Sequence, residues 1–284
     1  MHMRRFGPLV REVPVIGAGT WNFPTRGAQV ARAIEAIRAG IEVGLTHIDT
    51  AEMYGDGRSE EIIGEAIADI PRERLFIVSK VLPSNASYDG TLRACERSLR
   101  RLRTDYLDVY LLHWRGRIAL QETMRALESL VDSASIRALG VSNFDVEDLD
   151  EARAALRTHP LVCNQVLYHL QERGIERRVL PYCRKHEIAI VGYSPLGSGD
   201  FPAHNSVRGR VLAQIAQRHG ASPQQVALAF LVRLDGTFTI PKAAQPDHAR
   251  ENARAGSLNL SPEDIAAIDA AFPAPTRDGP LAVL

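Results

Sequence analysis

The chain has 284 residues, of which 45% are apolar and 24% are charged, and its 34 lysines and arginines balance its 34 aspartates and glutamates. This balance gives no overall field that would attract nucleic acid or an anionic membrane, so neither is expected as a partner. No apolar run approaches the ~18 residues of a membrane span, and no secretory signal precedes Gly7, so the sequence predicts a cytoplasmic protein that acts on a small molecule.

Short apolar runs alternate with amphipathic segments along the chain. Strands are predicted at 13–19, 45–49, 75–80, 106–113, 136–141, 161–166, 188–193 and 237–241. Helices are predicted between them at 28–43, 58–69, 89–101, 120–132, 146–156, 174–186, 222–233 and 247–255. Eight such alternations predict a parallel sheet, and eight strands close a (β/α)8 TIM barrel of about 250 residues. We therefore expect one barrel domain over residues 1–284.

A doubly wound open sheet is the competing α/β architecture, and two features argue against it. The first strand leads through Gly17-Ala18-Gly19 into Asn22-Phe23-Pro24, not directly into a helix, so the dinucleotide-binding fingerprint fails its structural context. Candidate site residues also end many different strands, which suits a ring of strand ends better than one crevice. After the eighth repeat, Ser261-Pro262 predicts the start of an additional C-terminal helix that runs to Ala271.

Three predicted strands end on residues of catalytic type, namely Asp49, Lys80 and His113, and Tyr54 follows in the turn after Asp49. In a parallel barrel these strand ends share one rim, where active sites form. A tyrosine normally titrates near 10, so a proton-transferring Tyr54 needs a nearby Lys80 ammonium to lower its pKa, with Asp49 keeping that ammonium charged. His113 can donate a hydrogen bond to a carbonyl oxygen. This set protonates a carbonyl but has no hydride source, which implies a cofactor.

The cysteines give no sign of a metal or redox site. Cys95, Cys163 and Cys183 are an odd number, widely spaced and without a CxxC pair. Neither a disulfide framework nor a zinc site is therefore expected, and no other metal site is predicted. We expect three buried free thiols.

Several motifs together resemble the aldo-keto reductases, in particular the small bacterial-type aldehyde and dicarbonyl reductases. The most specific is His47-Ile48-Asp49-Thr50-Ala51-Glu52-Met53-Tyr54-Gly55, with Ser59-Glu60-Glu61 and Gly64 after it. The others follow in the family's order at strand ends: Leu75 to Lys80, Leu111-Leu112-His113-Trp114, Gly140 to Phe144, Asn164-Gln165, Gly192 to Gly197 and Ile240-Pro241-Lys242. The resemblance covers about residues 13 to 272.

The resemblance implies carbonyl reduction with Tyr54 as proton donor, Lys80 and Asp49 as its tuning pair, and His113 orienting the carbonyl. It also implies a nicotinamide cofactor, NADPH in preference to a more weakly used NADH. Tyr193 would stack on the nicotinamide, Ser142, Asn143 and Gln165 would bind its carboxamide, and Lys242 would face the 2′-phosphate. The remaining cofactor residues implied are Thr20, Ser194, Leu196, Ser198, His248, Glu251 and Asn252.

The sequence departs from the family pattern at the cofactor's outer end. Ala243 replaces a frequent serine, and His248 stands where many NADP-dependent members have arginine. Asn22 stands where a lysine often pairs with an acidic residue across the pyrophosphate, which leaves Asp200 without that partner. These changes bear on cofactor grip and preference more than on the reaction.

The expected substrates are small aldehydes, ketones and dicarbonyls. Trp21 and Trp114 should add apolar walls beside the carbonyl, and the loops after Trp114 and Gly197 and the tail after Phe272 are short. Short loops predict an open cleft. No long apolar or coiled-coil segment demands assembly, so a monomer is expected.

Two other functions remain compatible with the residues. A barrel lyase could use Lys80 as a Schiff-base nucleophile with Tyr54 as proton relay. A non-catalytic cofactor-binding subunit could keep the fold without turnover, although the intact set of four residues argues against it.

Overall fold

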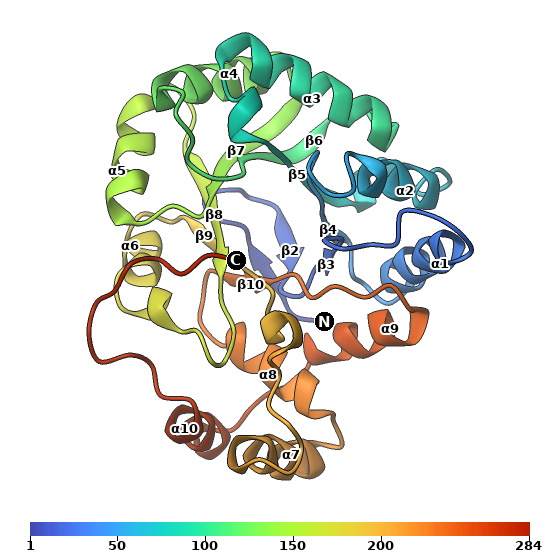
Figure 1. Ribbon diagram of the computed structural model, residues 1–284, viewed down its shortest axis with the longest axis vertical. Coiled ribbons are helices and arrows are strands. Elements are labelled where there is room, and N and C mark those ends of the chain that lie inside the picture. The colour runs from blue at the N-terminus through green and yellow to red at the C-terminus, as the bar shows by residue number, and fades with distance from the viewer.

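The computed structural model describes residues 1–284, and its central element is an eight-stranded parallel sheet in which each strand lies beside its neighbour in sequence (Figure 1). The strands are β3 (Ala18–Gly19), β4 (His47–Asp49), β5 (Phe76–Val81), β6 (Leu107–Leu112), β7 (Ile136–Ser142), β8 (Leu161–Leu167), β9 (Ala189–Tyr193) and β10 (Thr237–Thr239). Parallel bridges join Ile16 to Thr239 and Gly19 to Lys242, so the first strand also meets the last. The predicted (β/α)8 barrel is confirmed.

Helices surround this sheet at the predicted places (Figure 1). They are α1 (Gln29–Glu42), α2 (Arg58–Ala66), α3 (Tyr88–Leu102), α4 (Leu120–Asp132), α5 (Val146–Ala155), α6 (Val179–Lys185), α8 (Pro223–Leu231) and α9 (Pro246–Ala255). The additional helix α10 (Pro262–Ala271) begins at Ser261, whose hydroxyl accepts from the backbone N–H of Asp264 at 3.2 Å. None of the helices combines the length and apolarity that a bilayer crossing requires; the cytoplasmic location stays a prediction.

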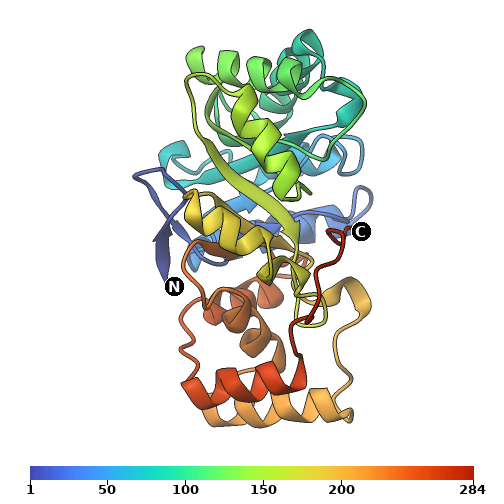
Figure 2. The ribbon, with the colours of Figure 1, turned by 90° about the vertical axis from the view of Figure 1, so that its left-hand side faces the viewer.

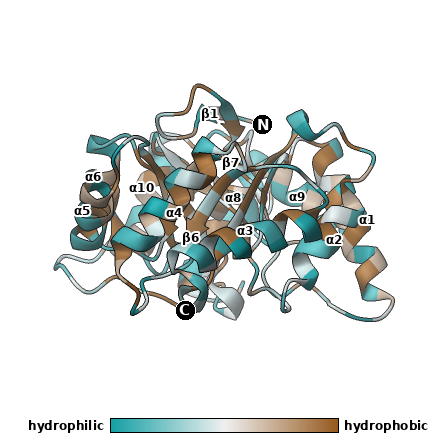
Figure 3. Cartoon of the chain, turned by 90° about the horizontal axis from the view of Figure 1, so that it is seen from above, coloured by the Kyte–Doolittle hydropathy of each residue, from teal (hydrophilic) through white to brown (hydrophobic).

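The structure contains a hairpin and a helix that the pattern did not predict. The predicted strand 13–19 is divided, because β2 (Glu12–Pro14) pairs antiparallel with β1 (Met3–Arg5) instead of joining the barrel. This hairpin lies at the end of the barrel opposite the chain's C-terminus (Figure 3). The second addition, α7 (Val207–His219), precedes α8 and lies beside α10 (Figure 2).

Alternation along the strands places the site residues inside the barrel. On β5, Phe76 and Val78 belong to the apolar cluster inside the barrel, whereas Ile77 packs in the larger cluster that includes residues of the surrounding helices. Successive side chains of a strand point to opposite faces, so Lys80 points inward like Phe76 and Val78. The same rule carries His113 inward after Val109 and Leu111. The barrel interior is therefore apolar toward the amino ends of the strands and polar at their carboxyl ends.

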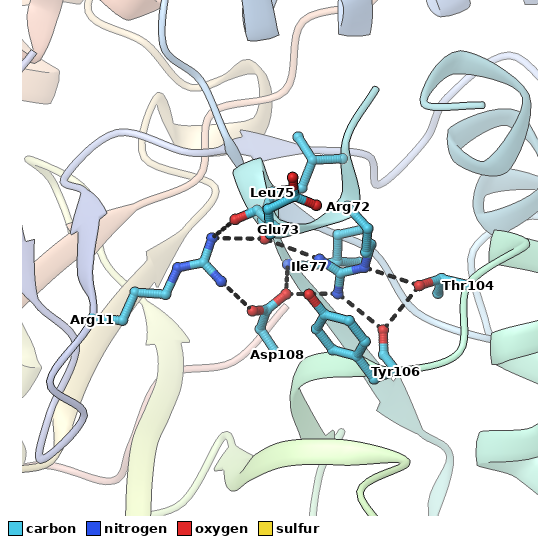
Figure 4. A network of polar contacts seen from close by, with 8 residues as sticks. All are labelled: Arg11, Arg72, Glu73, Leu75, Ile77, Thr104, Tyr106 and Asp108. Carbon is cyan, nitrogen blue, oxygen red and sulfur yellow. Dashed lines mark hydrogen bonds and ion pairs between the residues drawn. The ribbon is translucent and has the colours of Figure 1, made fainter. Parts of the chain in front are cut away.

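A charged network holds the opposite end of the barrel together (Figure 4). Asp108 is 3% exposed, and its carboxylate accepts from Arg11 Nη1 and Arg72 Nη2, each at 2.7 Å, and from the backbone N–H of Ile77 at 2.8 Å. Arg11 belongs to the hairpin region and Arg72 precedes β5, so one buried carboxylate joins three parts of the chain. We assign this network to stability because it lies at the amino ends of the strands.

The three cysteines are free and buried, as predicted. Burial raises the pKa of the Cys95 and Cys183 thiols to about 12, and it raises the pKa of Cys163 as well. A thiol needs its thiolate form to react or to bind a metal, so these residues act as core side chains.

Candidate active site

Four predicted catalytic residues meet at the carboxyl ends of β4, β5 and β6. Lys80 Nζ donates to Asp49 Oδ1 at 2.6 Å, to the backbone oxygen of Thr50 at 2.8 Å and to the Tyr54 hydroxyl at 3.2 Å. The rings of Tyr54 and His113 lie edge to face, with centroids 5.7 Å apart. Because an acid, an amine, a phenol and an imidazole are in one cluster, the arrangement can hold and transfer a proton.

The Lys80–Asp49 pair is enclosed by protein. Lys80 is 0% and Asp49 1% exposed. Burial alone would lower the pKa of Lys80, but the Asp49 carboxylate and the Tyr54 oxygen raise it overall, so the ammonium stays charged. Burial also raises the pKa of Asp49, opposed by Lys80 and by Gln165, whose Nε2 donates to Asp49 Oδ2 at 2.7 Å.

The pKa of Tyr54 differs from the sequence expectation. Burial raises it above the ordinary value, and the nearby Lys80 ammonium offsets only part of that effect. Lys80 acts on the pKa of Tyr54 in the predicted direction, but the net shift is upward because of burial, whose depth sequence patterns do not give. A raised pKa keeps the phenol protonated at neutral pH, which is the state a proton donor requires.

His113 is neutral in this environment. Burial, and then the Lys80 charge, lower the pKa of its imidazole to about 2. Its Nδ1 atom is buried and has no hydrogen-bond partner. A neutral imidazole carries one N–H, so His113 can donate one hydrogen bond without bringing a second positive charge next to Lys80.

A cavity of about 160 Å³ opens over these residues. Most of the predicted site residues line it: Thr20, Trp21, Asp49, Tyr54, His113, Trp114, Ser142, Asn143, Gln165, Tyr193, Ser194 and Lys242. Lys80 lies behind Asp49 and Tyr54 and is reached through them. Five further residues line the cavity to which pattern reasoning assigned no role in the site: Gly19, Met53, Pro195, Ile240 and Leu284.

One wall of the cavity carries an amide oxygen and a hydroxyl group that are free to form hydrogen bonds with a ligand. Gln165 Nε2 faces the Asp49 carboxylate, which can only accept, so Oε1 is the Gln165 atom that remains for a ligand. Ser142 Oγ accepts from Asn143 Nδ2 at 3.2 Å and keeps its own proton to donate. An acceptor beside a donor complements the N–H₂ and C=O of a carboxamide. The Tyr193 hydroxyl donates to Asn143 Oδ1 at 2.9 Å and fixes the ring at the same wall.

Comparison with known proteins places this geometry in a family. The profile of the aldo/keto reductase family matches residues 15–272. The chain belongs to the aldo/keto reductase family. The methylglyoxal reductase YeaE of Escherichia coli is 44% identical over 93% of this chain and 92% of its own length, and the glyoxal reductase of Bacillus subtilis is 38% identical over 91% and 89%.

Solved structures agree with the sequence comparison. An aldo/keto reductase from Klebsiella pneumoniae in complex with NADP and acetate has a TM-score of 0.92 and 44% identity over 99% of each chain. The structure of an aldo-keto reductase from the same organism in complex with NADPH has the same TM-score and covers 100% of each chain. The resemblance to the aldo-keto reductases and the predicted barrel fold are thus both supported over nearly the whole chain.

In this aldo/keto reductase, the outer predicted cofactor residues do not line the cavity. Leu196 lines a small neighbouring hollow together with Asp200, and Ser198 is exposed in the turn between them. The other three are on α9, where His248 is exposed, Glu251 is half-buried and Asn252 is buried. Their assignment to the cofactor stays a prediction.

Asp200, for which the resemblance implied a partner at position 22, forms a hydrogen bond with a different residue. Gln171 Nε2 donates to Asp200 Oδ2 at 2.8 Å. Asn22 adopts a left-handed backbone with φ 57° at the start of its loop. The loop of Asp200 is therefore attached to the segment after β8 instead of to residue 22.

The carboxyl-terminal tail changes the predicted shape of the mouth. After α10 it runs back across the barrel, and the C-terminus lies over the mouth (Figure 1). Arg177 Nε donates to Asp278 at 2.7 Å, and Leu284 lines the cavity. The tail is short, as expected, yet it contributes to the rim, because twelve residues after Phe272 can span up to roughly 40 Å when extended.

Proposed function

We propose that this aldo/keto reductase is an NADPH-dependent enzyme that reduces small aldehydes, ketones and dicarbonyls to alcohols. The observation that carries the proposal is the buried chain of contacts from Asp49 through Lys80 to the Tyr54 hydroxyl, next to a neutral His113 and open to the cavity. This series of contacts places the Tyr54 hydroxyl proton where a carbonyl group can enter the cavity.

The protein's own groups have distinct roles in this reaction. His113 donates its single N–H to the carbonyl oxygen and orients it. Tyr54 then gives its proton to the oxygen as negative charge develops, and the Lys80 ammonium stabilises the phenolate that remains. Asp49 keeps Lys80 charged and in place. The nicotinamide, when bound, supplies the hydride.

The residues present fit a nicotinamide cofactor. Gln165 Oε1 and the Ser142 hydroxyl offer the acceptor and donor that a carboxamide needs, and Tyr193 provides an aromatic wall. Lys242 lines the cavity rim with an exposed side chain, which suits the 2′-phosphate of NADPH. The relatives crystallised with NADP and NADPH support the same choice.

The apolar rim favours small substrates. Trp21, Trp114, Met53 and Leu284 surround a cavity of about 160 Å³. The names of the methylglyoxal and glyoxal reductases among the relatives point to dicarbonyls of two or three carbons. We propose this substrate class for the present chain.

The lyase alternative is disfavoured by the state of Lys80. A Schiff base requires a neutral amine, whereas the Asp49 carboxylate and the Tyr54 oxygen raise the pKa of Lys80 overall despite burial. The lysine is also fully buried behind Tyr54.

A binding titration followed by turnover tests the proposal. NADPH is titrated by fluorescence, and oxidation is followed at 340 nm on glyoxal, methylglyoxal and a set of longer aldehydes. We expect micromolar binding and turnover that is best on the shortest substrates. Binding without turnover would favour a non-catalytic subunit, and borohydride trapping on Lys80 without NADPH binding would favour the lyase.

A further inference from the structure

The loop that carries Tyr54 has little regular structure of its own. The tyrosine loop, residues 50–57, connects β4 to α2. Three successive residues, Gly55, Asp56 and Gly57, have positive φ values of 58°, 53° and 88°. Such a turn does not fix the position of a phenol by itself. Yet the Tyr54 hydroxyl must stay 3.2 Å from Lys80 Nζ on the neighbouring strand.

Two buried carboxylates attach this loop to the strand that carries Lys80. On one side, Glu52 accepts from the backbone N–H of Leu82 at 2.8 Å and from Asn85 Nδ2 at 2.9 Å. On the other side, Glu60 at the start of α2 accepts from Ser79 Oγ at 2.6 Å. The attachment points therefore flank Lys80: Ser79 precedes it on β5, and Leu82 follows two residues after it, just past the end of the strand.

Both carboxylates are nearly removed from solvent, with Glu52 8% and Glu60 0% exposed. Arg101 Nε donates to Glu60 Oε2 at 2.6 Å and balances its charge. The same guanidinium packs over the turn, since a Cβ at Gly57 would lie 2.6 Å from Arg101 Nε. Buried carboxylates are costly unless fully bonded, so these two hold the loop in one place.

We propose that Glu52 and the Ser79–Glu60 pair form a clamp that positions Tyr54 against Lys80, and that Glu52, Ser79 and Glu60 are positioning residues for proton transfer. The proposal rests on the proposed role of Tyr54 as proton donor. None of the three touches the cavity. They act only through the distance and alignment between the phenol and the ammonium.

Loss of the clamp has a predictable chemical consequence. The titratable groups facing Tyr54 are Lys80, Asp49, His113 and Tyr193. Lys80 is the group that lowers the pKa of Tyr54 against the effect of burial. When the hydroxyl moves away from Lys80 while the ring stays buried, the phenol loses that charge and its pKa rises further. The alkaline limb of the kcat profile should then move to higher pH while kcat falls.

The experiment compares Glu52→Ala, Ser79→Ala and their combination with wild type and with Tyr54→Phe. Ser79→Ala removes one small hydroxyl and leaves the Glu60–Arg101 pair intact, which limits the loss of stability, and urea unfolding of each variant checks its fold. Glu52→Gln keeps one acceptor oxygen and should restore part of the loss. The matched control is Glu61→Ala, which removes the neighbouring carboxylate on the outer side of α2, paired with Arg58. NADPH affinity, kcat, KM and the pH profile of kcat are measured for each.

We expect kcat to fall roughly tenfold in either single variant and roughly 100-fold in the double variant, as for a misplacement of about 1 Å. NADPH affinity should stay within twofold, and the alkaline limb should move upward. Wild-type kcat and profile in both single variants, with Tyr54→Phe inactive, would overturn the clamp and leave the proposed function standing. A loss of kcat with an unmoved profile would also overturn it, because it would indicate a merely structural role. An active Tyr54→Phe would instead refute the proposed function.

Discussion

The substitution Asp49→Asn isolates the buried charge pair at the centre of the site. Asparagine has nearly the same shape and can still accept a hydrogen bond from Lys80, but it removes the negative charge 2.6 Å from Nζ. Lys80 is 0% exposed, so water cannot solvate its ammonium group once the carboxylate charge is gone. Breaking a buried pair on one side typically costs about 3–5 kcal/mol of unfolding free energy. For a chain near this size that corresponds to a fall in Tm of about 6–10 °C.

The pH dependence of this loss has a definite sign. In the wild type the pKa of Lys80 is raised, so its stabilising effect is complete below the ordinary lysine pKa and is lost only above it. In the variant, burial is no longer opposed by a carboxylate, and the pKa of Lys80 falls below its unfolded value. The folded state then releases a proton that the unfolded state keeps, so stability recovers as pH rises, by at most about 1.36 kcal/mol per pH unit.

Urea unfolding at pH 7 and pH 9 measures this effect. We expect the stability deficit of Asp49→Asn to shrink by up to about 2.7 kcal/mol between the two pH values. The deficit in kcat should grow over the same range, because the neutral lysine no longer stabilises the Tyr54 phenolate. A stability deficit that is independent of pH would mean that Lys80 does not depend on Asp49 for its charge, and the electrostatic reasoning would be wrong.

Three further substitutions test other parts of the molecule. Asp108→Asn should cost about 3–5 kcal/mol in urea unfolding because it breaks the arginine network at the closed end of the barrel, with kcat per folded molecule unchanged. Lys242→Ala should weaken NADPH roughly ten- to a hundredfold and leave NADH turnover nearly intact, and an unchanged cofactor ratio would exclude Lys242 from the phosphate site. Gln165→Met should weaken NADPH about tenfold in a fluorescence titration and raise the pKa of Asp49 further, so an unaltered affinity would separate it from the carboxamide.

Strand periodicity was enough to predict the catalytic cluster. Lys80 and His113 each continue an inward-facing row of apolar residues, and Asp49 follows the inward-facing His47, so the sequence pattern already placed all three at one rim. The pKa direction of Tyr54 could not be predicted, because it depends on burial and not on the neighbours alone. The position of the tail and of Leu284 could not be predicted either, because residues 273–284 form no helix or strand and so carry no hydrophobic periodicity.

The elements that escaped prediction have identifiable reasons. The strands of the amino-terminal hairpin, Met3–Arg5 and Glu12–Pro14, are three residues long, too short for an alternation to register. The helix Val207–His219 does carry apolar residues at helical spacing, including Leu212 and Ile215. It was missed because a barrel repeat requires only one helix, and the helix predicted at 222–233 already filled that place.

The most direct test of the central claim is hydride transfer in Tyr54→Phe. The variant keeps the ring and its packing and removes only the hydroxyl that lies 3.2 Å from Lys80. General acid catalysis is worth about 100- to 10,000-fold, so single-turnover oxidation of bound NADPH by methylglyoxal should slow by that factor. NADPH affinity should remain within twofold of wild type. A rate within threefold of wild type, at equal cofactor affinity, would show that Tyr54 is not the proton donor.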